Sequence, residues 1–177
     1  MMLHQDLNNC NTIRIAGVVR ESIVDGPGFR FAVFCQGCPH GCPGCHNPAT
    51  HDFEGGYDCE LEKIIAAVDA NPLLDGVTFS GGEPFCQPKA FYELGVELKK
   101  RNLNLMAYSG YTYEELIALN DEWVNKLLSI LDLLVDGRYV QEERDLTLLF
   151  RGSKNQRVID MNLTRDKKEV ILAEKYI

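Results

Sequence analysis

The chain has 177 residues, of which 45% are hydrophobic and 25% charged, and its formal net charge is −8 at pH 7. This composition is typical of a globular protein with a hydrophobic core, and the chain is too short for a complete eightfold βα barrel of about 250 residues. The acidic net charge argues against a nucleic-acid binder that neutralises phosphates, and no segment approaches the roughly 18 apolar residues of a membrane span.

The predicted elements begin with two strands. Residues 12–19 alternate in part between apolar and polar side chains, and residues 29–35 are aromatic and β-branched. Between them, residues 25–28 (Asp-Gly-Pro-Gly) are typical of a turn. The loop that follows contains three prolines, which exclude regular structure there.

Helical and strand patterns then alternate along the chain. Apolar spacing predicts helices over residues 61–68, 91–98, 113–117 and 124–131, and strands over residues 77–80, 103–108, 131–135 and 157–161. Spacings of 26 to 28 residues between strand starts leave room for the crossovers that parallel strands require. We therefore expect one α/β domain over residues 1–177, an open partial βα barrel of about six mainly parallel strands. Its functional site should lie at the carboxyl ends of the strands.

Four of the seven cysteines lie within residues 35–45. An odd number of cysteines, in a chain whose first residues lack the basic and apolar regions of a signal peptide, does not indicate a disulfide framework. We expect a cytoplasmic protein whose clustered thiolates bind an iron–sulfur cluster or zinc. The scattered Cys10, Cys59 and Cys86 are expected to be small buried or idle thiols.

Two ligand sets fit this cluster. Cys38, Cys42 and Cys45 form a C-x3-C-x2-C motif, and three thiolates on a four-iron cluster leave one iron open to a substrate. With Cys35 as a fourth ligand, the motif instead becomes a closed zinc knuckle or an electron-transfer cluster. Spacing alone does not separate the two, although the position of Cys35 on the apolar face of its strand favours a packed residue.

A second motif follows the strand at residues 77–80. Gly81 and Gly82 allow the backbone to approach a ligand closely, and Glu83 offers a carboxylate to an ammonium group. The alternative is a plain strand-to-helix turn, with Pro84 opening the helix.

Together, the two motifs resemble the radical S-adenosylmethionine superfamily. The resemblance implies that Cys38, Cys42 and Cys45 bind one 4Fe–4S cluster and that the Gly-Gly-Glu segment holds the methionine amino group of S-adenosylmethionine. Catalysis then belongs to the cluster and the cofactor, with no further catalytic residue.

Further segments resemble the subgroup that activates glycyl-radical enzymes, namely residues 24–30 (VDGPGFR) and 45–48 (CHNP). Residues 108–112 (YSGYT) and 151–157 (RGSKNQR) resemble its branch acting on anaerobic ribonucleoside-triphosphate reductases. This resemblance implies an oxidoreductase that generates a glycyl radical on the large reductase subunit. It also implies a low-potential electron donor such as flavodoxin or ferredoxin, and no nucleic-acid or membrane partner.

The resemblance also implies a set of cofactor contacts. Many members of the superfamily have an aromatic residue at the position of Gly44, so His46 is a candidate for the contact with adenine. His40 and His51 are expected to be loop histidines rather than ligands. The residues expected to bind the cofactor are Gly44, Cys45, His46, Gly81, Gly82, Glu83, Ser109 and Asp136, and those expected to contact the partner or the cofactor are Arg151 and Arg157.

Three other functions stay open. One is an activating enzyme of another glycyl-radical enzyme such as pyruvate formate-lyase, against which the RGSKNQR segment counts. Another is a small radical enzyme acting on a nucleoside-like substrate. The third is a non-catalytic zinc or iron–sulfur module with Cys35 as fourth ligand.

Overall fold

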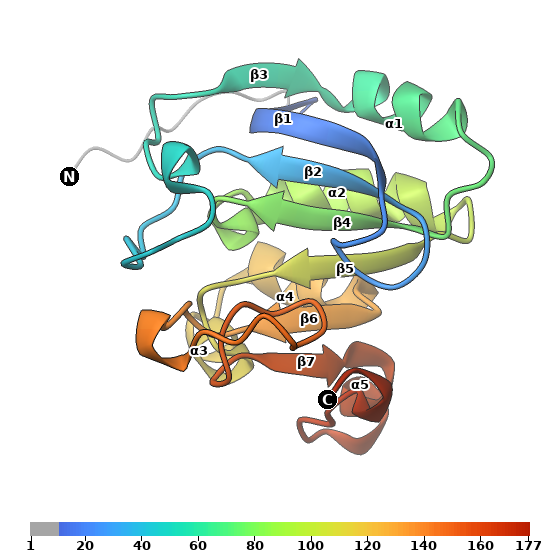
Figure 1. The fold of residues 1–177 in the computed structure, drawn as a ribbon. Helices are drawn as coiled ribbons and strands as arrows, with labels where there is room; N and C mark the ends of the chain where they lie inside the picture. Colours follow the sequence, from blue (N-terminus) through green and yellow to red (C-terminus); the bar gives the residue numbers. More distant parts are fainter. Residues whose placement is uncertain (1–10) are drawn as a thin grey trace.

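The computed structural model describes residues 11–177, so His4 and Cys10 lie outside the described part of the chain. The strands form one open sheet in the order β3-β1-β2-β4-β5-β6-β7 (Figure 1). The strands are β1 (Thr12–Ser22), β2 (Arg30–Cys35), β3 (Tyr57–Glu60), β4 (Gly76–Gly81), β5 (Asn104–Tyr108), β6 (Leu133–Asp136) and β7 (Arg157–Asp160). The helices are α1 (Leu61–Asp69), α2 (Pro88–Lys99), α3 (Tyr113–Ala118), α4 (Glu122–Ile130) and α5 (Met161–Lys167).

The sheet is mixed, which corrects the expectation of about six mainly parallel strands. β2, β4, β5 and β6 are parallel neighbours, whereas β1, β3 and β7 pair antiparallel. β7 is antiparallel because the connection from β6 contains no α-helix to make a crossover. The short β3 was not predicted because its side chains are mostly exposed and leave no buried face to detect.

Helices α1, α2 and α4 cover one face of the sheet (Figure 1). The predicted helices are confirmed, since their apolar side chains at helical spacing form the core with alternate residues of the strands. Phe79 of β4 and Phe91 of α2, for example, are both fully buried, with their ring centroids 4.7 Å apart. Burial of each such side chain contributes about 2–3 kcal/mol. Helix α5 was not predicted.

The opposite face is covered by two loops, the segments before β2 and before β7 (Figure 1). The first is fixed by the buried Arg30, which donates to the Thr78 hydroxyl at 2.7 Å and to the carbonyl of Pro27 at 2.9 Å. The second is fixed by Phe150, whose ring lies 5.3 Å from that of Tyr176. Within residues 11–177, no helix has the length and apolar composition needed to cross a membrane.

Candidate functional site

The cysteine-rich loop follows β2 at the edge of the sheet where the parallel strands end. Its two ends are joined, because the N–H of Gly37 donates to the carbonyl of Thr50 at 2.8 Å and that of Cys38 to the carbonyl of His51 at 3.2 Å. The N–H of Glu83 also donates to the carbonyl of Gly37 at 2.8 Å. The cysteine motif and the Gly-Gly-Glu segment are therefore held against each other by the backbone.

Cys38, Cys42 and Cys45 are free thiols, partly exposed, and all three line one cavity of about 120 Å³. The N–H of Asn47 donates to Sγ of Cys45 at 3.4 Å. Hydrogen bonds to cysteine sulfur adjust the reduction potential of iron–sulfur clusters. Within residues 11–177, no three His, Cys, Asp or Glu side chains converge on a point that one metal ion could occupy. Each thiolate of a four-iron cluster binds a different iron, so such ligands need not converge.

Cys35 does not line the cavity of the other three cysteines. Its side chain is fully buried in the core between sheet and helices, together with Phe31 and Val33. Burial raises the pKa of the Cys35 thiol well above its ordinary value. The expectation that Cys35 is a packed strand residue is confirmed.

Gly81 and Gly82 are required by backbone packing. A Cβ on Gly81, whose φ is +95°, would lie 2.5 Å from the nitrogen of Cys35, and one on Gly82 would lie 2.3 Å from the carbonyl oxygen of Gly37. The space that we expected to admit a ligand is thus filled by the chain itself at these two positions. Both glycines still line the cavity of the three cysteines.

Glu83 is fully buried, and four residues donate to its carboxylate. Oε1 accepts from the N–H of Phe85 at 3.1 Å, and Oε2 accepts from the N–H of Gly110 at 2.8 Å. The Ser109 hydroxyl lies 3.0 and 3.1 Å from the two oxygens. His40 Nε2 completes the set at 2.7 Å from Oε2. The structure therefore brings the predicted residues Glu83 and Ser109 together and adds His40 to them.

His40 lies in the cysteine loop as expected, but its side chain is almost fully buried. Its ring makes an edge contact with Tyr111, with centroids 4.5 Å apart, and a Cβ on Gly110 would lie 2.2 Å from it. The absence of a side chain at position 110 therefore gives the imidazole access to Glu83. No sequence signal links His40 to Glu83, which is 43 residues away.

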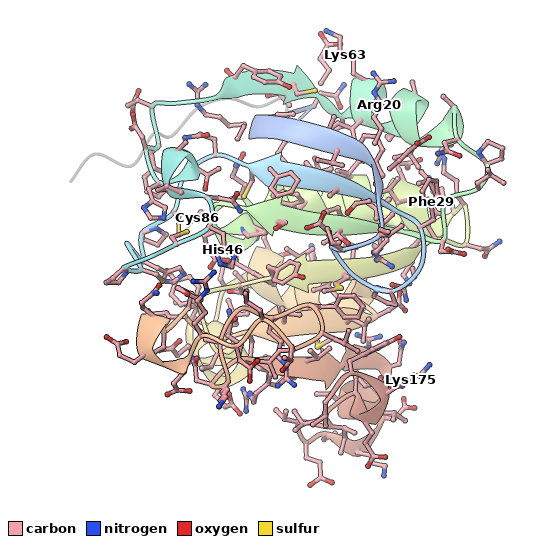
Figure 2. All side chains as sticks on the ribbon, viewed as in Figure 1. Arg20, Phe29, His46, Lys63, Cys86 and Lys175 are labelled. Atoms are coloured by element: carbon pink, nitrogen blue, oxygen red, sulfur yellow. The ribbon has the colours of Figure 1, made fainter. Side chains whose placement is uncertain are left out.

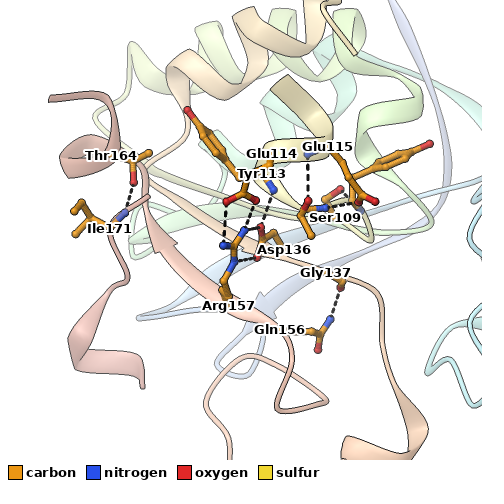
Figure 3. Close-up of polar contacts among 12 residues, drawn as sticks. Ser109, Tyr113, Glu114, Glu115, Asp136, Gly137, Gln156, Arg157, Thr164 and Ile171 are labelled. Carbon is orange, nitrogen blue, oxygen red and sulfur yellow. Dashed lines mark hydrogen bonds and ion pairs between the residues drawn. The ribbon is translucent and has the colours of Figure 1, made fainter. Parts of the chain in front are cut away.

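Asp136 and Arg157 form a pair with two hydrogen bonds, from Nε at 3.0 Å and Nη2 at 2.5 Å (Figure 3). Asp136 is buried and also accepts from the N–H of Tyr113 at 2.7 Å, while Arg157 also contacts Glu114. These carboxylates raise the pKa of the Arg157 guanidinium above its ordinary value. Neither Asp136 nor Arg157 lines the cavity of the cysteines.

The side chains of the RGSKNQR segment form hydrogen bonds with the backbone of the residues that follow β6. Gln156 donates to the carbonyl of Gly137 at 3.0 Å (Figure 3), and Asn155 donates to that of Arg138 at 2.7 Å. The side-chain oxygen of Gln156 accepts from the N–H of Gly152 at 2.9 Å. Arg151 donates to the carbonyl of Gln156 at 3.1 Å.

A larger cavity of about 390 Å³ adjoins the cysteine loop on the face covered by the two loops. Cys45, Gly81 and Arg151 line it, together with His46 and Tyr139, whose rings lie 5.3 Å apart. Figure 2 shows His46 at the end of the sheet that carries the cysteine loop.

Gly44 has φ +74°, and a Cβ there would lie 2.0 Å from the side chain of Gln141 and 3.3 Å from the ring of Tyr139. The positive φ disfavours any side chain at position 44, and a side chain there would also have to displace that of Gln141. Tyr139 supplies an aromatic ring nearby. The sequence did not indicate Tyr139, because it belongs to a distant loop without regular structure. Of the other described cysteines, Cys59 is half-buried and Cys86 exposed, both as free thiols.

A family model described as a 4Fe-4S single cluster domain matches residues 24–159. The anaerobic ribonucleoside-triphosphate reductase-activating protein of Vibrio cholerae is 37% identical over 142 residues, which are 76% of this chain and 89% of that protein. The protein of the same name from Escherichia coli K12 is 33% identical over 144 residues, covering 76% of this chain and 90% of that protein. That of Enterobacteria phage T4 is 29% identical over 142 residues, 76% of this chain and 86% of that protein.

Proposed function

Because the chain belongs to the family of anaerobic ribonucleoside-triphosphate reductase-activating proteins, we propose that it generates the glycyl radical of an anaerobic (class III) ribonucleoside-triphosphate reductase. One observation of the structure carries this proposal. The three cysteines of the C-x3-C-x2-C motif and the Gly-Gly segment before Glu83 line the same cavity, while Cys35 is packed in the core.

Cys38, Cys42 and Cys45 would hold a 4Fe–4S cluster, because three soft, partly exposed thiols face one cavity on a loop fixed at both ends. The burial of Cys35 supports an iron without a protein ligand. When bound, the reduced cluster supplies the electron that cleaves S-adenosylmethionine into methionine and a 5′-deoxyadenosyl radical, which takes a hydrogen atom from a glycine Cα of the reductase.

The residues around this cavity would orient the cofactor. Gly82, Glu83 and Ser109 would face the methionine end, and an ammonium that binds Glu83 takes the oxygen now bonded to His40. Gly81 forms part of the same wall.

Residues of the larger cavity would face the rest of the cofactor or the partner. His46 would lie against the adenosine, next to Gly44 and Cys45, with Tyr139 beside it. The guanidinium of Arg151 would contact a carboxylate of the cofactor or the partner.

Asp136 and Arg157 would act as positioning residues. Their pair holds the N–H of Tyr113, and thus the chain after Ser109, against the end of β6. Asp136 would therefore act on the cofactor indirectly and not by contact, because its carboxylate already accepts hydrogen bonds from Arg157 and from the N–H of Tyr113.

We further propose that the chain is one domain whose mixed sheet curves as the partial barrel of radical S-adenosylmethionine enzymes. Its open side would admit a loop of the reductase. The reductive chemistry and the six free thiols of the described residues favour a cytoplasmic site of action. A flavodoxin or a ferredoxin would supply the electron.

The test is anaerobic incubation of the reconstituted protein with reductant, S-adenosylmethionine and an anaerobic ribonucleoside-triphosphate reductase. We expect a glycyl-radical doublet in the electron paramagnetic resonance spectrum, with equivalent amounts of 5′-deoxyadenosine and methionine. The Cys42→Ala variant should give neither. Cofactor cleavage without a radical on this reductase, but with one on pyruvate formate-lyase, would contradict the assignment.

A further inference from the structure

The four most exposed large apolar residues within residues 11–177 are Leu146, Leu73, Ile23 and Val24, with 78%, 76%, 75% and 73% of their surface exposed. Three of them belong to the two loops that border the larger cavity, and Val24 and Leu146 line it directly. Apolar side chains gathered around one opening are typical of a surface that binds another protein.

The first of these loops is held in place by hydrogen bonds. The hydroxyl of Ser22 donates to the Asp25 carboxylate at 2.5 Å and accepts from the N–H groups of Val24 and Asp25 at 3.3 Å. The hydroxyl of Thr78 donates to the carbonyl of Asp25 at 2.6 Å. Ile23 and Val24 therefore face solvent on a fixed turn.

The second loop, the segment before β7, is also fixed by contacts with the rest of the protein. The N–H of Asp145 donates to the carbonyl of Gly152 at 3.2 Å, which closes the loop at its base. Phe150 packs against Tyr176 on the sheet side. Leu146 lies between these two attachments and is left exposed. A preorganised apolar surface loses less conformational entropy on binding than a mobile one.

We infer that Ile23, Val24 and Leu146 form the docking rim for an apolar, glycine-bearing segment of the reductase. This inference rests on the proposed function. Hydrogen transfer requires the glycine Cα to reach the cofactor at van der Waals distance, and Cys45 and Gly81 line the cavity that this rim borders. A segment that enters this cavity between the two loops passes the rim, and apolar side chains beside its glycine would cover the exposed surface of the rim.

The test is the affinity of the cluster-loaded protein for the reductase, measured anaerobically by calorimetry with S-adenosylmethionine present. We expect Leu146→Glu to weaken binding at least tenfold, because a charge would be buried in an apolar contact. Val24→Glu should do the same from the opposite loop. Leu73→Glu is the matched control, since Leu73 is similarly exposed but lies outside both loops. The affinity of this variant for the reductase should stay within twofold of wild type.

Iron content and melting temperature show that each variant is loaded and folded. Equal affinities of Leu146→Glu, Val24→Glu and Leu73→Glu would overturn the inference. It would also be overturned if the rim variants bound the reductase normally but changed the sedimentation of the protein alone, because the rim would then join two copies of this chain. Failure of the wild-type protein to cleave S-adenosylmethionine would instead contradict the proposed function.

Discussion

The imidazole of His40 and the carboxylate of Glu83 lie 2.7 Å apart, with 4% and 0% of their side chains exposed. This contact joins the cysteine loop to the Gly-Gly-Glu segment through side chains, in addition to the backbone bonds between the same segments. The protein's own contacts therefore hold this wall of the cavity together. A ligand ammonium that uses Glu83 must replace a contact that the protein already makes.

Replacing His40 by Ala should lower the free energy of unfolding by about 1–3 kcal/mol, because Glu83 would lose a buried hydrogen-bond partner. Urea denaturation under reducing conditions measures this loss. His51→Ala is the control, since His51 lies in the same loop and makes no side-chain hydrogen bond among the described residues. Equal stability of the two variants would show that the contact contributes nothing.

Replacing Gly110 by Ala should also break the hydrogen bond between His40 and Glu83. The added Cβ would lie 2.2 Å from the ring of His40 and must displace it from Glu83. The chemical shift of the His40 imidazole, measured by nuclear magnetic resonance, reports whether the ring still contacts Glu83. Gly17→Ala is the control, because a Cβ there meets nothing within 4 Å. An unchanged imidazole signal in Gly110→Ala would contradict the close packing of Gly110 against His40.

Cys35→Ala should retain the cluster, whereas Cys42→Ala should lose it. The first substitution removes a sulfur from the hydrophobic core and should cost about 1–2 kcal/mol of stability. The second removes a thiol that faces the cavity. Iron and sulfide content after reconstitution distinguishes them, and loss of iron in Cys35→Ala would contradict the three-cysteine assignment.

Asp132 should make the stability depend on pH in acid. Burial opposes its ionisation, but hydrogen bonds from Lys99, the N–H of Leu105 at 2.8 Å and Asn162 at 3.1 Å outweigh burial, so the pKa of Asp132 lies below its ordinary value. The unfolded chain, with a carboxyl pKa of about 3.9, takes up this proton first, so the stabilisation is full above that pH and is lost as the pH falls through the folded pKa.

Asp132→Asn should therefore be less stable than wild type at pH 7, by about 1–2 kcal/mol. The difference should shrink below about pH 4. Urea denaturation across this range measures it, with the exposed Asp166→Asn as control. A difference that stays constant with pH would show that the ionised carboxylate is not the cause.

Much of the fold follows from sequence pattern, because helical spacing and buried strands leave periodic signals. The helices around Leu94 and Leu127 and the four parallel strands were predicted on this basis. The direction of β7 was not, since it depends on whether a connection contains a helix. Strand β3 was missed because an exposed edge strand has no buried face.

For the site, the sequence indicated the three cavity cysteines, Glu83 and Ser109, because each follows a strand at the same edge of the sheet. It did not indicate His40 as the partner of Glu83, or Tyr139 as that of His46. Both contacts join segments far apart in the chain, and neither has a local signature. The mutual pairing of Asp136 and Arg157 was likewise not evident from residue type.

The most direct test of the central claim is electron paramagnetic resonance of the reconstituted, reduced protein with and without S-adenosylmethionine. Three cysteine ligands leave one iron able to bind the cofactor, so the cluster signal should change on its addition, in wild type and in Cys35→Ala alike. A signal that stays the same would mean that the fourth iron already has a protein ligand, and would contradict the account.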